Sequence, residues 1–292
     1  MRKRRPRAVS QHKLARRDEL LVLTAGFLKR VQVDFKETYA FEVTHQPIYL
    51  PHLPSEFEGF RIVQLSDIHH SPYLTLEHLS EAVAIANNLD PDLIVLTGDY
   101  ITHTAVYIEP CAERLGDLKA KHGVYAVLGN HDVWVNARAV TKAFERHHIH
   151  VLTNINTEIS IRGSSIWLSG IGDLMMHFHD LPAALKGTTS KFPRILLSHN
   201  PEIIEEAAYS NVDLVLAGHT HGGQFQLPLI GSPMALNRYG RRYARGLAAM
   251  QDTQIYVNRG LGTVFVPVRY QCPPEISLLE LTADPLKPLI SE

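Results

Sequence analysis

The stretch VDLVLAGHTHGG (residues 212–223) joins an apolar run, typical of a buried strand, to two histidines at its end. Buried polar side chains need partners, so a strand inside a core gains nothing from imidazoles at its tip. His219 and His221 are one residue apart and flanked by glycine or threonine, which leaves both rings accessible to a ligand. Because neutral imidazole is the commonest metal ligand in proteins, this stretch predicts a metal site at the end of a strand.

Four further apolar runs end in the same way, with metal-ligating residue types directly after the last apolar position. They are FRIVQLSDIHH (60–70), DLIVLTGDY (92–100), GVYAVLGNHD (123–132) and RILLSHNP (194–201). Helical spacing of apolar residues between the first two runs, and the alternation of strand and helix, predict an α/β fold with a largely parallel core. Since ligand sites form beyond the carboxyl ends of parallel strands, we expect the five endings to converge although they are far apart in sequence.

Each ending has an ordinary structural explanation when it is taken alone. Asp67 and Asp99 are residue types that cap turns and helices, and His199 would pass as a hydrogen-bonded structural histidine. Asn130 alone indicates only a turn. Five endings of one kind along a single chain are what favour a metal site over these alternatives.

The bulk composition excludes some classes of function. At 292 residues the chain is long enough for a sizeable core, and its formal net charge of −1 argues against a general affinity for nucleic acid. Cys111 and Cys272 lack CxxC spacing, so neither a disulfide framework nor a thiolate metal site is indicated. We therefore expect a reducing, cytoplasmic compartment.

The amino-terminal segment differs from the rest. MRKRRPRAVSQHKLARR (1–17) carries eight Lys or Arg and no acid, and LLVLTAGFL (20–28) follows it. The apolar run is shorter than the roughly 20 residues that span a bilayer, and no signal-peptide cleavage site follows it. Residues 1–30 are typical of a segment that lies on an anionic membrane, here the inner face, although a solvated tail ahead of a packed helix explains them too. We expect an extension over 1–57, one domain over 58–282 and a tail over 283–292.

In chain order the five endings read D-x-H, G-D, G-N-H-D, H and G-H-x-H. This order resembles the calcineurin-like metallophosphoesterase superfamily over about residues 58–282. The resemblance implies a four-layer α/β/β/α sandwich, with two mixed sheets flanked by helices and a metal site at the carboxyl ends of the strands. The run GDYITHT lacks the second acid and the arginine of the protein serine/threonine phosphatases, whereas GHTHGGQFQLPLIG resembles the bacterial small-substrate and phosphodiesterase branch.

The resemblance also implies roles for individual residues. Seven side chains would ligate two metal ions: Asp67, His69 and His221 for one ion, Asn130, His199 and His219 for the other, and Asp99 as a bridge. His131 would not be a ligand but the acid that protonates the leaving oxygen.

The implied ligand set suits some metals better than others. Histidine nitrogens combined with two carboxylates and an amide favour Mn, Fe or Zn over Ca²⁺ or Mg²⁺, and the sequence does not choose among the three. Arg259 at a strand end and Arg241 in RYGRRYARG (238–246) are candidates for binding a phosphate, although a solvated basic loop is the alternative.

The sequence therefore predicts a dinuclear metal-dependent phosphoesterase, preferentially a phosphodiesterase, in which a metal-bound hydroxide attacks phosphorus. A pyrophosphatase that acts at the membrane on a nucleotide-linked glycolipid of the UDP-diacylglucosamine type shares this chemistry and is the alternative. A non-catalytic interaction module on the same fold is a lesser alternative, because no predicted ligand is missing. The natural substrate and the oligomeric state are left open.

Overall fold

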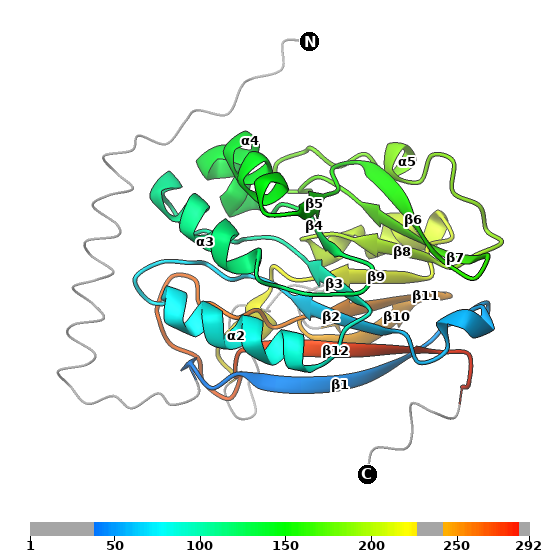
Figure 1. The fold of residues 1–292 in the computed structure, drawn as a ribbon, viewed down its shortest axis with the longest axis horizontal. Coiled ribbons are helices and arrows are strands. Elements are labelled where there is room, and N and C mark those ends of the chain that lie inside the picture. Colours follow the sequence, from blue (N-terminus) through cyan, green and yellow to red (C-terminus); the bar gives the residue numbers. More distant parts are fainter. Residues whose placement is uncertain (1–37, 227–241, 286–292) are drawn as a thin grey trace.

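Two mixed six-stranded sheets form the centre of the molecule (Figure 1). The computed structural model describes residues 38–226 and 242–285. In spatial order, the first sheet consists of β1 (Glu42–Tyr49), β12 (Glu275–Thr282), β2 (Arg61–Leu65), β3 (Leu93–Leu96), β4 (Val124–Ala126) and β5 (Ile149–Val151). The second consists of β10 (Gly246–Met250), β11 (Thr253–Val257), β9 (Leu214–Ala217), β8 (Arg194–Leu197), β7 (Ser164–Gly170) and β6 (Ile155–Ile161).

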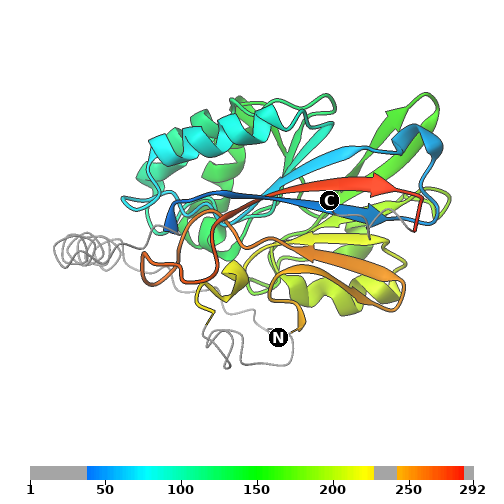
Figure 2. The ribbon, with the colours of Figure 1, turned by 90° about the horizontal axis from the view of Figure 1, so that it is seen from below.

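Helices cover the outer face of each sheet (Figure 2). The first sheet packs against α2 (Leu76–Asn88), α3 (Ile108–Leu115) and α4 (Asn130–Arg146). The second packs against α5 (Leu181–Ala184) and α6 (Ile204–Tyr209). Short 3₁₀ turns complete the described elements: η2 (Ser55–Phe57), η3 (Ala105–Tyr107), η4 (Pro201–Ile203) and η5 (His221–Gly223). The predicted α/β/β/α sandwich is confirmed.

Central strands are buried on both faces, which explains their unbroken apolar sequences. In β9, Leu214 and Leu216 belong to the core between the two sheets, whereas Val215 and Ala217 belong to the core under α5 and α6. Successive side chains of a strand point to opposite faces, so a strand between two apolar layers needs apolar residues at every position. The polar residues that follow Ala217 are therefore the first that the strand can accept.

The first sheet contains a strand that the sequence pattern did not indicate. β1 pairs in parallel with β12 along its whole length, from Glu42 opposite Glu275 to Tyr49 opposite Thr282. The regular fold was expected to begin near residue 58. The sequence of β1, EVTHQPIY, contains no apolar run, because most of its residues are exposed or only partly buried. Its place at the edge of the sheet accounts for this composition and for the tolerance of Pro47.

The parallel strands end at one side of the sandwich. β2, β3, β4 and β5 run parallel to one another in the first sheet, as do β7, β8, β9 and β11 in the second.

Within the described ranges, no helix has both the length and the apolar character needed to cross a bilayer. Residues 1–30, the predicted membrane-contacting arm, lie outside those ranges.

Candidate metal centre

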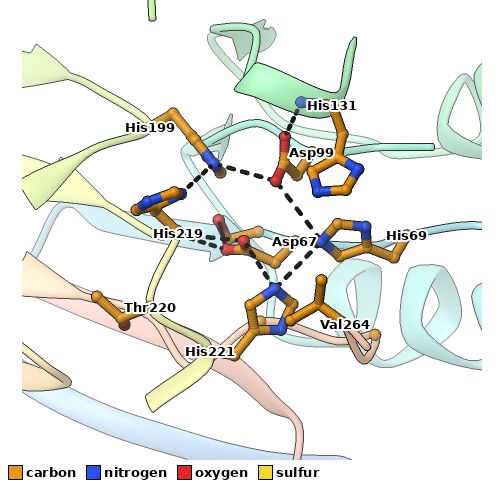
Figure 3. Close-up of polar contacts among 12 residues, drawn as sticks. Asp67, His69, Asp99, His131, His199, His219, Thr220, His221 and Val264 are labelled. Atoms are coloured by element: carbon orange, nitrogen blue, oxygen red, sulfur yellow. Dashed lines mark hydrogen bonds and ion pairs between the residues drawn. The ribbon is translucent and has the colours of Figure 1, made fainter. Parts of the chain in front are cut away.

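The predicted metal ligands gather where parallel strands of both sheets end (Figure 3). They come from the ends of five strands: Asp67 and His69 after β2, Asp99 after β3, Asn130 after β4, His199 after β8, and His219 and His221 after β9. The two sheets bring together residues that are up to 154 positions apart in the sequence, from Asp67 to His221.

Asp67, His69 and His221 form one buried cluster, in which their ligand atoms all lie within 4.8 Å of one another. The Nε2 atom of His221 is 3.3 Å from Oδ1 of Asp67 and 3.1 Å from Nε2 of His69. Burial lowers the pKa of His69 and of His221 well below the ordinary value, and neighbouring cationic groups lower it further. Both rings are therefore neutral at pH 7, which is the protonation state that binds a metal.

Asp99, His199 and His219 form a second cluster with the same 4.8 Å spread of ligand atoms. The Nε2 atom of His199 lies 3.2 Å from Oδ2 of Asp99 and 3.1 Å from Nδ1 of His219. Burial opposes a charge on His199, but the attraction of Asp99 outweighs burial and raises the pKa of His199 to about 10. Burial lowers the pKa of His219 to about 4. In the protein alone a proton on His199 compensates Asp99, and a metal cation would replace it.

Asp99 connects the two clusters. Its Oδ2 atom lies 3.2 Å from Nε2 of His199 in the second cluster and 3.6 Å from Nε2 of His69 in the first. Its Oδ1 atom accepts a hydrogen bond of 2.9 Å from the backbone N–H of His131. One carboxylate oxygen therefore faces both clusters while the other fixes the orientation of the group, as a bridging ligand requires.

Asn130 supplies an unsatisfied buried oxygen. The residue is 3 % exposed, and its Oδ1 atom has no hydrogen-bond partner within the part of the chain that the structure describes. A buried amide oxygen without a partner costs about 1–3 kcal/mol, so such atoms are rare unless a ligand satisfies them. Together with the two clusters, this oxygen fits the predicted seven-ligand set for two cations.

His131 lies beside the clusters, with its ring edge-on to that of His69 at 4.8 Å between centroids. Its Nδ1 atom is 2.7 Å from the carbonyl oxygen of Thr102, which can only accept, so Nδ1 carries a proton and donates. Its ring also offers a nitrogen within 4.8 Å of the ligand atoms of His69 and Asp99. The geometry thus permits either an acid or a ligand, and the acid role stays a prediction.

Of the two arginines predicted to bind substrate, Arg259 lies within the described residues. Arg259 is only 8 % exposed, and its guanidinium already contacts two carboxylates. Its Nε donates to Glu275 at 2.8 Å and its Nη2 donates to Glu42 at 3.0 Å. These contacts hold the end of β11 against β1 and β12, and a role in binding phosphate stays a prediction. Arg241 lies outside the described residues.

Asp132 organises the site although the sequence analysis gave it no role. It is fully buried, and its carboxylate accepts backbone N–H groups of Gly129, Asp99 and Tyr100, each at 2.9 Å. It therefore fixes the turn that carries Asp99 against the turn that carries Asn130. The signal was available in the sequence, because an acid three residues after a helix N-cap indicates a capping box.

Replacing Asp132 with asparagine should lower the free energy of unfolding by about 1–3 kcal/mol. The new amide NH₂ would face backbone N–H groups that the carboxylate accepts, and a buried donor would lose its partner. Urea unfolding of the metal-free protein measures the change. Asp117→Asn is the matched control: its side chain is 58 % exposed and pairs with Arg114, so the expected change is below about 0.5 kcal/mol. Equal stability of both variants would contradict the role of Asp132.

Arg269 is a second residue that the sequence analysis missed. It is fully buried, and its guanidinium donates to several backbone carbonyl groups, among them those of Arg259 at 2.8 Å, Gly260 at 3.0 Å and His221 at 3.5 Å. Burial lowers its pKa to about 10, which still leaves it charged at pH 7. The guanidinium thus ties the loop after β11 to the turn that presents His221. A lone arginine in a loop gives no sequence signal of such a role.

The backbone at the site is strained. Five predicted ligands adopt a positive φ: Asp67 at 47°, His69 at 48°, Asp99 at 56°, His219 at 71° and His221 at 52°. Such conformations cost about 1–3 kcal/mol each for residues other than glycine and collect at functional sites. Space is tight too, because a Cβ atom on Gly218 would lie 2.3 Å from Oδ2 of Asp67. Glycine at this position lets β9 approach the Asp67 carboxylate.

The fold and the site define an α/β protein of two packed sheets with a buried cluster of candidate metal ligands at their common edge. The family model for calcineurin-like phosphoesterases matches residues 60–223. The chain belongs to the calcineurin-like phosphoesterase family, and it is accordingly a phosphoric ester hydrolase of a family that binds metal ions.

Three relatives match the chain over most of its length. The metallophosphoesterase YkuE of Bacillus subtilis (strain 168) is 37% identical over 251 residues, which cover 85% of this chain and 87% of YkuE. The phosphodiesterase YaeI of Escherichia coli (strain K12) is 34% identical over 226 residues, 76% of this chain and 82% of YaeI. The UDP-2,3-diacylglucosamine pyrophosphatase LpxG of Chlamydia trachomatis (serovar D) is 28% identical over 323 residues, 90% of this chain and 96% of LpxG.

Proposed function

We propose that this protein is a phosphodiesterase with a dinuclear metal centre. The observation that carries the proposal is the position of Asp99, whose Oδ2 atom lies 3.2 Å from His199 and 3.6 Å from His69 and so faces two separate clusters. The similarity to YaeI, which is named a phosphodiesterase, supports the choice of diesters. The orphaned Oδ1 atom of Asn130 supports the second metal position.

In this proposal, seven residues hold the two cations and His131 is the proton donor. Two divalent cations of Mn, Fe or Zn would neutralise the anionic phosphate and make water a sufficient nucleophile near neutral pH. Their ligands would be Asp67, His69 and His221 for one, Asn130, His199 and His219 for the other, and Asp99 for both. The carbonyl of Thr102 holds Nδ1 of His131 as a donor and thereby orients the ring. His131 then gives a proton from Nε2 to the leaving oxygen, which would otherwise depart as a poorly stabilised alkoxide.

A panel of phosphate esters tests the proposal. The full-length protein, loaded with Mn²⁺, should hydrolyse bis(p-nitrophenyl) phosphate with a higher kcat/KM than p-nitrophenyl phosphate. Chelation with EDTA should lower the rate at least about 100-fold, because the two cations would supply both the charge that neutralises the phosphate and the activated water. No turnover of either ester with Mn²⁺, Fe²⁺ or Zn²⁺, or activity that survives complete removal of metal, would contradict a metal-dependent phosphoesterase.

One observation favours a second candidate, a pyrophosphatase acting on a nucleotide-linked glycolipid. Loops at the edge that holds the site expose large apolar side chains: Met175 and Phe178 are 52% and 53% exposed after β7, and Phe265 is 72% exposed after β11. Such side chains suit an amphiphilic substrate at a membrane surface, which the basic arm of residues 1–30 would also contact. LpxG carries the name of this activity. Adding UDP-glucose and a vesicle-embedded UDP-glycolipid to the same panel decides between the candidates by kcat/KM.

A further inference from the structure

Trp134 is a large aromatic side chain that is exposed to solvent beside the candidate site. It is one of two tryptophans in the chain and is 53% exposed. Its ring centroid lies 4.7 Å from that of His131, with the planes 58° apart. The ring centroid of His103 also lies 5.7 Å from that of His131, so the imidazole of His131 is close to the rings of both Trp134 and His103.

The position of Trp134 is fixed by its neighbours in the chain. Val133 and Val135 pack against the core under the helices, which turns the residue between them away from that core. α4 is interrupted at Asn136, where φ is −178° and ψ is 87°, and Oδ1 of Asn136 accepts the N–H of Ala139 at 3.1 Å. The segment 130–135 is thus a separate first turn.

This first turn is also anchored to the metal centre. Asp132, within the turn, accepts N–H groups of Asp99 and Tyr100 at 2.9 Å each, and the N–H of His131 donates to Asp99. Trp134 is therefore held on the same rigid unit as Asn130 and His131. An exposed indole on a rigid support, with no packing role for its outer face, is what a stacking surface for a planar ring requires.

We propose that Trp134 stacks on a planar aromatic ring of the substrate, such as a nucleobase, in the group that departs on the His131 side. The assignment to the leaving group rests on the proposed function, because His131 marks that side only if it is the acid. Binding of the ring itself does not depend on turnover. The substrates would then be phosphate esters in which one alcohol carries a planar aromatic ring.

Two probes that differ only in a base test the stacking directly. The Mn²⁺-loaded full-length protein is titrated with adenosine 5′-monophosphate and with ribose 5-phosphate by calorimetry, while phosphate release is monitored; where either probe is hydrolysed, KM is compared instead. The wild-type protein should bind the adenosine probe about tenfold more tightly or better, since a stacked base contributes substantially to affinity. Trp134→Ala should abolish this preference without changing the affinity for ribose 5-phosphate, and Trp134→Phe should retain part of it.

Tyr209→Ala is the matched control, because Tyr209 is 80% exposed at the end of α6, before the amino end of β9, and should leave both affinities unchanged. The inference is overturned if the wild-type protein binds the two probes equally, binds neither, or if Trp134→Ala keeps the preference. Equal loss of both affinities in Trp134→Ala would also overturn it, since it would assign Trp134 a purely structural role. Preferential binding of adenosine 5′-monophosphate without any ester hydrolysis would instead contradict the proposed function and still support the stacking site.

Discussion

Asp99→Asn should abolish the dinuclear centre and lower kcat/KM for bis(p-nitrophenyl) phosphate by about 10⁴-fold. The substitution removes the negative charge of Asp99, which faces both clusters at 3.2 Å from His199 and 3.6 Å from His69. The amide can still accept the N–H of His131 through its oxygen, so the turn should keep its shape. Metal content after dialysis and initial rates, measured on the same sample, check the expectation.

Asp213→Asn provides the control for this experiment. Asp213 is a partly buried acid whose Oδ2 accepts the N–H of Arg194 at 2.8 Å, at the end of the second sheet away from the site. We expect full metal content and unchanged turnover in this variant. If Asp99→Asn retained two metals per chain and an activity close to that of the wild type, the bridging role of Asp99 would be wrong.

His131→Ala should lower kcat by about 10²–10⁴-fold while both metals stay bound. The loss should depend on the leaving group. p-Nitrophenolate departs readily without a proton, whereas an alkoxide does not, so a diester with an alkyl leaving group should lose at least about tenfold more activity than bis(p-nitrophenyl) phosphate. Parallel rate measurements on the two esters, with metal analysis of the variant, separate the acid from other roles.

The outcome of that experiment also distinguishes the two roles that the geometry of His131 permits. Loss of a metal in His131→Ala would identify the residue as a ligand. This role is geometrically possible, because the ligand atoms of His131, His69 and Asp99 lie within 4.8 Å of one another. Equal losses on both esters with the metals in place would argue against proton donation. His150→Ala, on β5 away from the site, is the control and should change neither rate nor metal content.

Most of the candidate site could be predicted because its residues follow apolar strands in recognisable local patterns. Asp67, Asp99 and His219 each come directly after such a run, and the topology of parallel strands is enough to bring them together. Assigning two clusters with a shared carboxylate needed the family resemblance, since spacing alone does not tell which sheet faces which. Oδ2 of Asp99 lies 3.2 Å from Nε2 of His199 and 3.6 Å from Nε2 of His69, and its role as a bridging ligand stays a prediction.

Other features could not be predicted because they depend on contacts between distant segments. β1 has no apolar run, and only its pairing with β12 at the edge of the sheet makes it a strand. Arg269 looks like an ordinary loop cation until its burial among carbonyl groups is seen. The exposure of Trp134 gives no local signal in the sequence, because it follows from the break at Asn136 and from the packing of its two valine neighbours.

The most direct test of the account is a titration of the metal-free, full-length protein with Mn²⁺ in which bound metal and hydrolysis of bis(p-nitrophenyl) phosphate are followed together. For a dinuclear centre we expect binding to saturate at two ions per chain and full activity to appear only as the second ion binds. Saturation at one ion with full activity, or activity in the absence of bound metal, would contradict a dinuclear phosphodiesterase.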